Sequence, residues 1–261
     1  MYADVEEVRF CSTANAGLQD SDLLALQSLP NVQVVEIVAA GITDKGLEHL
    51  AQLRNLRRLL LAETQVTSAG LQQLRHCPIE QLVLNGNRIT DETLHCLDAF
   101  PKLKKLALYE TSVSDEGLAN LRCLKLLEHL YLNKCPITDQ GMRHVADATG
   151  LTCLELFHLD VGDTGIKELE RLRKLASLDI EHLNVTDEGI VSIARLPWVS
   201  HLWVFDTRVT KAGLLKFEKS GILRSLVVGP DFSAEAIEEL QELLPACKVY
   251  NSNELIRFHG P

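Results

Sequence analysis

The sequence is poor in aromatic residues and in basic residues, and both shortages limit what the protein can be. Aromatic residues make up 5% of the 261 residues, so the 46% of hydrophobic residues are mostly aliphatic, with leucine foremost. Lysine and arginine number 26 against 36 acidic residues, which gives a net charge of -10 and a pI near 5.4. Because nucleic-acid-binding proteins usually present a basic surface, we expect no nucleic-acid partner.

Disulfide and membrane-spanning patterns are also lacking. The seven cysteines are odd in number and include no CxxC pair, which excludes the usual disulfide and zinc spacings. Isolated thiols are typical of a reducing compartment. Residues 1–10 are charged rather than apolar, and no run of about 20 apolar residues occurs. We therefore expect a cytoplasmic protein without membrane insertion.

The chain does contain a repeat of 23–24 residues. The segment ITDKGLEHLAQLRNLRRLLLAETQ begins at Ile42, and a weaker copy precedes it at Leu18. Similar segments begin at Val66, Ile89, Val113, Ile137, Val161, Val185 and Val209. A fixed period over almost the whole chain predicts stacked units that share one continuous core.

The repeats predict a single domain over residues 1–261. Residues 1–17 are expected to form an N-terminal capping strand and loop, residues 18–231 nine repeats, and residues 232–261 a C-terminal cap. Solenoids need polar caps because their terminal units would otherwise expose the core.

Each repeat predicts one short helix and one short strand. Leu47 and Leu50 are three residues apart, as on one face of a helix, and Thr43–Asp44 stand where a helix N-cap is expected. Leu59 and Leu61 alternate with other residues, as in a strand that is buried on one face.

The segment LRRLLLAETQV resembles the leucine-rich repeat pattern LxxLxLxxNxL, and the start TDxGLxxL resembles the subclass common in bacterial leucine-rich repeat proteins. It is also similar to the repeats of F-box receptors, although no F-box precedes the array. The resemblance implies an α/β solenoid, a horseshoe with a parallel concave sheet and short convex helices. One departure is that only Asn87 keeps the asparagine of the pattern. Other residues take its place in the other repeats, including Leu159 and Leu183, which cannot form the family's side-chain ladder at all.

The stretch SHLWVFDT, residues 200–207, carries large apolar groups on both faces of an extended chain. Leu202 and Val204 occupy the core register of the repeat, so His201, Trp203 and Phe205 are predicted to project from the concave face. A one-residue slip would bury Trp203 but would expose both core residues.

Applied to every repeat, this register collects five aromatic residues and four of the nine histidines on the concave face. Aromatic residues are enriched at protein interfaces. The candidate partner-binding residues are Tyr109, His129, Tyr131, Glu155, Phe157, His158, Asp179, Glu181, His182, His201, Trp203, Phe205 and Asp206. Partial shielding of these side chains by the curved solenoid itself is the alternative.

Acidic residues cluster on the same face. Glu155 and Asp179 share a register in neighbouring repeats, and Glu181 lies between Phe157 and Phe205. Like charges in adjacent strands destabilise a sheet, which suggests a site that accepts a cation. Our hypothesis is that a lysine or arginine of a basic partner enters this cluster, with the aromatic rings adding cation–π attraction. A solvated acidic face is the alternative.

Catalytic and metal sites have weaker support. His158 and His182 share a register with Asp206 next to them, which could hold zinc or nickel. However, no HExxH, GxSxG or P-loop motif is present, and no serine or cysteine lies in a recognisable triad. We therefore expect neither an enzyme nor a protein with a bound metal or other cofactor.

The sequence thus predicts a non-catalytic, monomeric interaction module or scaffold, which binds a protein or peptide on its concave face. The alternative is a substrate receptor or regulatory subunit of a larger complex, such as a ubiquitin-ligase-like adaptor. The identity of the partner does not follow from the fold, because function depends on the site that the fold carries.

Overall fold

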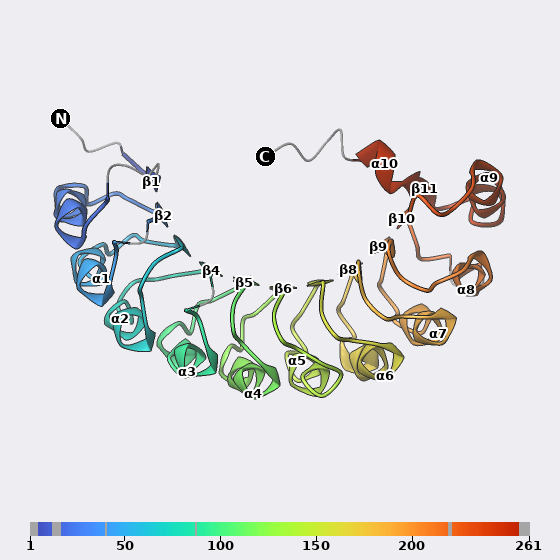
Figure 1. The fold of residues 1–261 in the computed structure, drawn as a ribbon, viewed down its shortest axis with the longest axis horizontal. Helices are drawn as coiled ribbons and strands as arrows, with labels where there is room; N and C mark the ends of the chain where they lie inside the picture. The colour runs from blue at the N-terminus through green and yellow to red at the C-terminus, as the bar shows by residue number, and fades with distance from the viewer. Residues whose placement is uncertain (1–4, 12–16, 40, 87, 219–220, 256–261) are drawn as a thin grey trace. The chain divides into compact units, whose positions relative to one another are not determined.

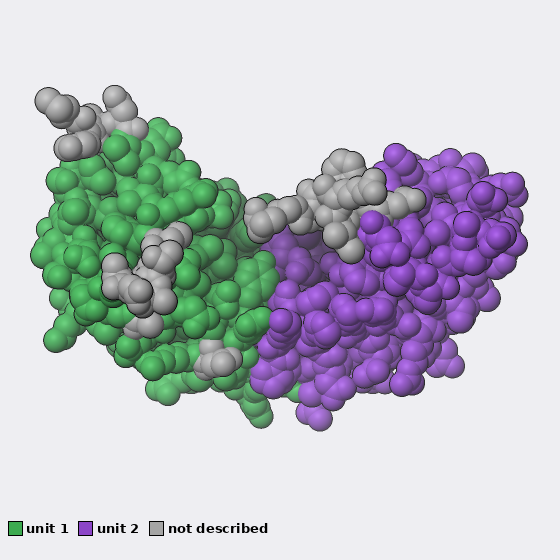
Figure 2. Space-filling model, turned by 45° about the horizontal axis from the view of Figure 1, so that its top comes forward, with its two compact units in different colours: residues 1–129 green, residues 130–261 purple. Residues whose placement is uncertain are grey.

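A computed structural model describes residues 5–11, 17–39, 41–86, 88–218 and 221–255. The chain divides into two compact units, residues 1–129 (unit 1) and residues 130–261 (unit 2), shown in Figure 2. Within each unit, parallel strands are hydrogen-bonded in chain order and alternate with short helices. The expected α/β solenoid architecture is therefore confirmed.

The strands of unit 1 each follow one turn of the repeat. They are β1 (Glu7–Cys11), β2 (Val34–Val38), β3 (Arg58–Ala62), β4 (Gln81–Asn85) and β5 (Lys105–Tyr109). The helical segments of this unit are η1 (Asp20–Ser28), α1 (Asp44–Leu50), α2 (Ser68–Gln73), α3 (Asp91–Leu94), η2 (Leu97–Ala99), α4 (Asp115–Leu118) and η3 (Ala119–Cys123).

Unit 2 continues the same alternation, and the division between the units falls after the first residue of β6. Its strands are β6 (His129–Asn133), β7 (Cys153–Phe157), β8 (Ser177–Asp179), β9 (His201–Trp203), β10 (Ser225–Val228) and β11 (Lys248–Asn251). The helical segments are α5 (Met142–Ala146), α6 (Asp163–Glu168), η4 (Leu169–Arg171), α7 (Asp187–Ala194), α8 (Lys211–Leu214), η5 (Leu215–Phe217), α9 (Ala234–Leu243) and α10 (Ser252–Leu255).

The core of each repeat lies between its strand and its helix. In β3, Leu59 and Leu61 are at most 1% exposed, and the intervening residues face the other side of the strand. Ile166 and Leu169, from α6 and η4, are equally buried on the helical side of their repeat. Within each unit the strands line the inner side of a curve and the helices line the outer side (Figure 1). We call the inner, exposed surface of the strands the strand face.

An aspartate at the start of most helices joins one repeat to the next. The Asp163 carboxylate accepts hydrogen bonds from the backbone nitrogens of Thr186 and Gly189, at 2.8 and 3.0 Å, and from the Thr186 hydroxyl at 2.6 Å. These donors belong to the first turn of the following helix, where backbone N–H groups lack partners within the helix. The expected cap at Thr43–Asp44 therefore has two parts, because Thr43 caps its own helix and Asp44 caps the helix of the next repeat.

The glycine of the TDxG motif exists because this carboxylate occupies the space of a side chain. A Cβ added to Gly189 would lie 2.5 Å from Asp163 Oδ1 and 2.7 Å from Val185 Cγ1. The same aspartate–glycine arrangement recurs in the pairs Asp20 and Gly46, Asp44 and Gly70, Asp91 and Gly117, Asp139 and Gly165, and Asp187 and Gly213.

Two junctions between successive repeats depart from the motif at both positions, one at Ser68 and Thr93 and the other at Lys211 and Ala236. At the first, Ser68 replaces the aspartate of one repeat, and Thr93 stands where the next repeat would carry the glycine. The Thr93 hydroxyl accepts the hydrogen bond from the Thr90 nitrogen at 3.2 Å, in place of a carboxylate from the preceding repeat. The aspartate of one repeat and the glycine of the next therefore act as a pair, and a junction that lacks the aspartate also lacks the glycine.

Candidate functional site

The strand face of unit 2 brings together the central residues of the prediction. Strand pairing places Glu155 of β7 beside Asp179 of β8, and Asp179 beside Trp203 of β9. Leu202 and Val204 are at most 1% exposed, which confirms the register inferred from SHLWVFDT. The predicted neighbouring carboxyl groups are therefore confirmed, and an indole ring continues the same row.

A pocket of about 460 Å³ opens over β6, β7, β8 and β9. Six of the predicted residues line it, namely Tyr131, Glu155, Phe157, Asp179, Glu181 and Trp203. Asn133, Cys153, Leu154 and Ser177 line it as well, and sequence reasoning did not select them for the site. Three of these four, Asn133, Cys153 and Ser177, are half-buried residues of the strand face, so a search that went beyond aromatic and charged residues would have included them.

Burial changes the chemistry of the acidic cluster. Glu181 is only 8% exposed, and burial, followed by the nearby acids Asp179, Glu155 and Asp206, raises its pKa to about 9. Asp179 accepts a hydrogen bond from the Glu181 backbone nitrogen at 3.0 Å, but burial raises its pKa to about 8. Both groups therefore hold a proton at neutral pH until a counter-charge arrives. The alternative of a solvated acidic face is wrong for Glu181.

Two acceptors in this pocket have no partner within the described part of the chain. The Asn133 side-chain oxygen is buried and receives no hydrogen bond. The Glu181 carboxyl group likewise has neither a hydrogen bond nor an ion pair there, although its backbone is fully engaged in the repeat. Buried polar atoms in folded proteins are nearly always hydrogen-bonded, so the Asn133 oxygen requires an explanation, and the Glu181 side chain is unusual because it is 8% exposed and has no partner.

A second cluster lies where the strands end. His158 and His182 stack with ring centroids 4.0 Å apart and an interplanar angle of 10°, and Phe157 contacts both rings edge-on. His182 Nδ1 lies 3.0 Å from Asp206 Oδ2, and the Phe205 ring meets His182 at 75°. Burial, together with the neighbouring His182, lowers the pKa of His158.

This geometry does not suit the metal site that the histidine spacing suggested. Face-to-face imidazoles direct their nitrogen lone pairs side by side, whereas zinc ligands converge on one point. Among the described residues, no group of three or more His, Cys, Asp or Glu side chains is placed to hold a metal ion.

The remaining candidates are not among the residues that line the pocket. His201 stacks on Trp203 at 6.5 Å between centroids, and its Nδ1 lies 2.9 Å from the Ser200 hydroxyl. Tyr109 and His129 belong to unit 1 and do not line the pocket of unit 2.

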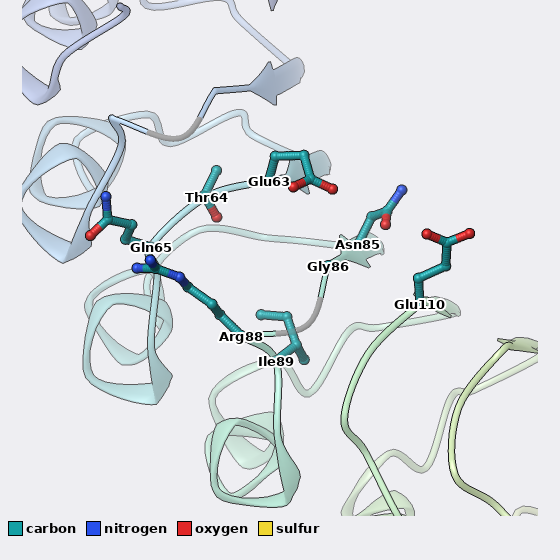
Figure 3. A pocket seen from close by; sticks show the side chains of 8 residues that line it. All are labelled: Glu63, Thr64, Gln65, Asn85, Gly86, Arg88, Ile89 and Glu110. Atoms are coloured by element: carbon teal, nitrogen blue, oxygen red, sulfur yellow. The ribbon is translucent and has the colours of Figure 1, made fainter.

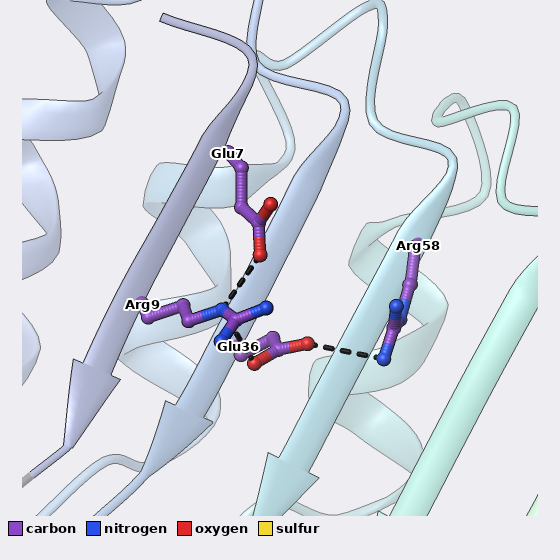
Figure 4. Close-up of polar contacts among 4 residues, drawn as sticks. All are labelled: Glu7, Arg9, Glu36 and Arg58. Carbon is purple, nitrogen blue, oxygen red and sulfur yellow. Dashed lines mark hydrogen bonds and ion pairs between the residues drawn. The ribbon is translucent and has the colours of Figure 1, made fainter.

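On the strand face of unit 1, the acidic residue Glu36 forms ion pairs with arginines of the same unit. Glu36 of β2 lies 3.1 Å from the guanidinium groups of both Arg9 and Arg58, on the neighbouring strands β1 and β3 (Figure 4). Glu7 also contacts Arg9, at 2.6 Å. A carboxylate on this surface is therefore neutralised within unit 1 itself.

Unit 1 also has a pocket, of about 250 Å³, at the ends of its strands (Figure 3). Glu63, Asn85 and Glu110 come from successive repeats, and Arg88 lines another part of the wall. No aromatic residue lines this pocket, and residue 87 beside it lies outside the described residues. It lacks the combination of rings and buried acids that distinguishes unit 2.

Comparisons with known proteins agree with the repeat architecture. A family model described as a leucine-rich repeat matches residues 123–146. Internalin C2 of Listeria monocytogenes is 20% identical with a TM-score of 0.56, over 92% of this chain and 87% of that one. Internalin F of the same organism is 20% identical with a TM-score of 0.58, over 87% and 71% respectively. No curated protein matches this sequence.

In the parts of the chain that the structure covers, no helix has the length and apolar character needed to cross a membrane. The longest helix, α9, has ten residues and exposes Glu235, Glu238, Glu239 and Glu242.

Proposed function

Because this chain is a leucine-rich repeat protein, we propose that it is a non-catalytic module that binds a protein or peptide partner on the strand face of unit 2. Repeat solenoids present extended inner surfaces that are suited to binding a partner.

The observation that carries the proposal is the half-buried aromatic surface around the pocket. Tyr131, Phe157, Trp203 and Phe205 all remain partly exposed on one side of unit 2, although the core beneath them is complete. Aromatic groups bury a large area at small entropic cost, and Tyr and Trp are enriched among the residues that dominate binding energy. Rings that only build the core would instead be buried on the side of the strands that carries the leucines.

The proposal is tested by affinity capture from a lysate of the source organism. The double variant Trp203→Ser, Phe205→Ser removes two rings from the strand face. Trp198→Ser is the matched control, because Trp198 is 64% exposed and is not among the residues that line the pocket.

Proteins bound by the wild type and by the control, but lost from the double variant, would support the strand face as the binding surface. Circular dichroism establishes that all three proteins are folded. An identical set of bound proteins for all three would contradict the proposal.

A further inference from the structure

We propose that the pocket over β6–β9 receives the guanidinium group of an arginine side chain from the partner. This inference rests on the proposed function and specifies the chemical group that the strand face recognises. It follows from three features of the pocket: acceptors without donors, the lack of an ion pair at Asp179 and Glu181 among the described residues, and aromatic walls.

The first feature is the pair of unpartnered acceptors. The Asn133 side-chain oxygen and the Glu181 carboxyl group both line the pocket, are both buried, and lack donors among the described residues. A ligand that completes this site must supply several N–H groups. A guanidinium group carries five in a fixed planar arrangement and accepts none, whereas an ammonium carries three.

The second feature is charge. In unit 1, Glu36 is paired with Arg9 and Arg58. In unit 2, neither Asp179 nor Glu181 forms an ion pair with any described lysine or arginine, although they lie on the equivalent surface. The cation that unit 1 supplies from its own strands is thus left in unit 2 for a partner to supply.

The third feature is the aromatic lining of the pocket. Tyr131, Phe157 and Trp203 line the pocket together with the carboxyl groups. Guanidinium groups are weakly hydrated and stack on aromatic faces, so they enter such a site at lower desolvation cost than a lysine ammonium does. The same pocket therefore favours arginine over lysine.

Arginine binding must be linked to proton release. The raised pKa values of Asp179 and Glu181, about 8 and about 9, mean that both groups are mainly protonated at neutral pH. An arriving cation favours the ionised forms and lowers both pKa values. The other titratable groups around the pocket are Tyr131 from β6, Lys134 directly after β6, Glu155 and Cys153 from β7, His201 from β9, and His158, His182 and Asp206 at the strand ends.

The sign of the pH effect follows. Because protons leave on binding, affinity for arginine should rise with pH, by up to about tenfold per pH unit for each proton released. The increase should level off above the pKa values of about 8 and about 9, where the carboxyl groups are already ionised. Carboxylates with ordinary pKa values would give an affinity that is flat over the same range.

Fluorescence of Trp203 reports binding directly. The chain has two tryptophans, so Trp198→Phe leaves Trp203 in the pocket wall as the sole indole. The probes are acetylated and amidated tripeptides, Gly-Arg-Gly, Gly-Lys-Gly and Gly-citrulline-Gly. Citrulline has nearly the shape of arginine but lacks its charge.

We expect the arginine tripeptide to change the emission saturably, with an affinity at least about tenfold higher than that of the citrulline tripeptide and rising with pH. Asp179→Asn combined with Glu181→Gln should remove the response. Glu36→Gln, in unit 1, should leave it unchanged. Circular dichroism keeps a folding defect distinct from a lost site.

The inference is overturned if no tripeptide gives a saturable change, if arginine binds no better than citrulline or lysine, or if its affinity does not depend on pH. Its failure is distinguishable from failure of the proposed function. Capture that still depends on Trp203 and Phe205 would leave the strand face as the binding surface but without an arginine contact.

Discussion

Gly189 offers a direct test of how successive repeats are joined. In the middle of an ordinary helix, replacing glycine by alanine stabilises a protein by about 1 kcal/mol. Here the new methyl group would lie 2.5 Å from Asp163 Oδ1 and 2.7 Å from Val185 Cγ1. One of these neighbours must move, and the carboxylate can move only by giving up hydrogen bonds to the next repeat.

The expected change in the free energy of unfolding follows from the hydrogen bonds of Asp163. Asp163 accepts from Thr186 twice, at 2.8 and 2.6 Å, and from the Gly189 nitrogen at 3.0 Å. A hydrogen bond to a charged group contributes about 1.5–3 kcal/mol, and an overpacked site costs about 1–3 kcal/mol. After the helix-propensity gain is subtracted, we expect Gly189→Ala to lower the free energy of unfolding by about 2 kcal/mol.

The junction between the repeats that carry Ser68 and Thr93 shows how the loss of the aspartate can be compensated. Asp163→Ser alone should cost about 2 kcal/mol, because the first turn of α7 loses its cap from the preceding repeat. Adding Gly189→Thr should recover part of this loss, because the introduced hydroxyl can accept from the Thr186 nitrogen as Thr93 accepts from Thr90. The two substitutions should couple favourably by at least about 1 kcal/mol.

Urea unfolding followed by tryptophan emission is the suitable assay, because Trp198 and Trp203 both lie in unit 2 and report on its repeats. Gly162→Ala is the matched control, since its Cβ would lie 3.4 Å from the Asn184 oxygen, at ordinary contact distance. The control should stay within about 0.5 kcal/mol of the wild type. A Gly189→Ala protein as stable as the wild type, or strictly additive substitutions at Asp163 and Gly189, would refute the argument.

Two further predictions concern titration and thiol reactivity. The folded-state pKa values of Asp179 and Glu181, about 8 and about 9, exceed the ordinary values of 3.8 and 4.5, so their contribution to stability is complete below the ordinary values and is lost progressively as the pH rises to about 8 and about 9. Asp179→Asn or Glu181→Gln should therefore raise the free energy of unfolding by about 1–3 kcal/mol more at pH about 9 than at pH about 5; an equal effect at both would contradict the assigned pKa values. Burial raises the pKa of Cys77 to about 11 and of Cys96 to about 12, so iodoacetamide near pH about 8 should leave both unmodified in the native protein and label them after denaturation. Mass spectrometry checks this, with half-buried Cys153 as the site expected to react in the native state.

The register of the strands was predictable because a shift by one residue exchanges the two faces of a strand. Leu202 and Val204 could not both be buried unless Trp203 projected from the other side. The same reasoning placed Glu155 beside Asp179, since the repeat length fixes which residues lie in neighbouring strands. The stacking of one strand and one helix per repeat also followed from the period, because neither element can bury its apolar face alone, whereas the curvature was implied by the resemblance to leucine-rich repeats.

Only part of the structural role of the TDxG motif could be predicted from the sequence. The sequence showed where helices begin, but the partner of Asp163 is a glycine in the following repeat, 26 positions away. The linkage depends on how closely consecutive helices approach each other, and the sequence of a single repeat does not contain that distance. The paired exception at Ser68 and Thr93 gains its explanation only from that contact.

The sequence by itself determined the solenoid, the register, and the set of aromatic and acidic residues on the strand face, because each depends on a local period. Tertiary structure alone decided that Glu181 is buried, that Asn133 has an unpartnered oxygen, and that His158 and His182 stack instead of converging. These properties depend on how side chains from several repeats enclose one another. Enclosure removes water from the carboxyl groups and sets their protonation, and that depends on three-dimensional packing rather than on spacing along the chain.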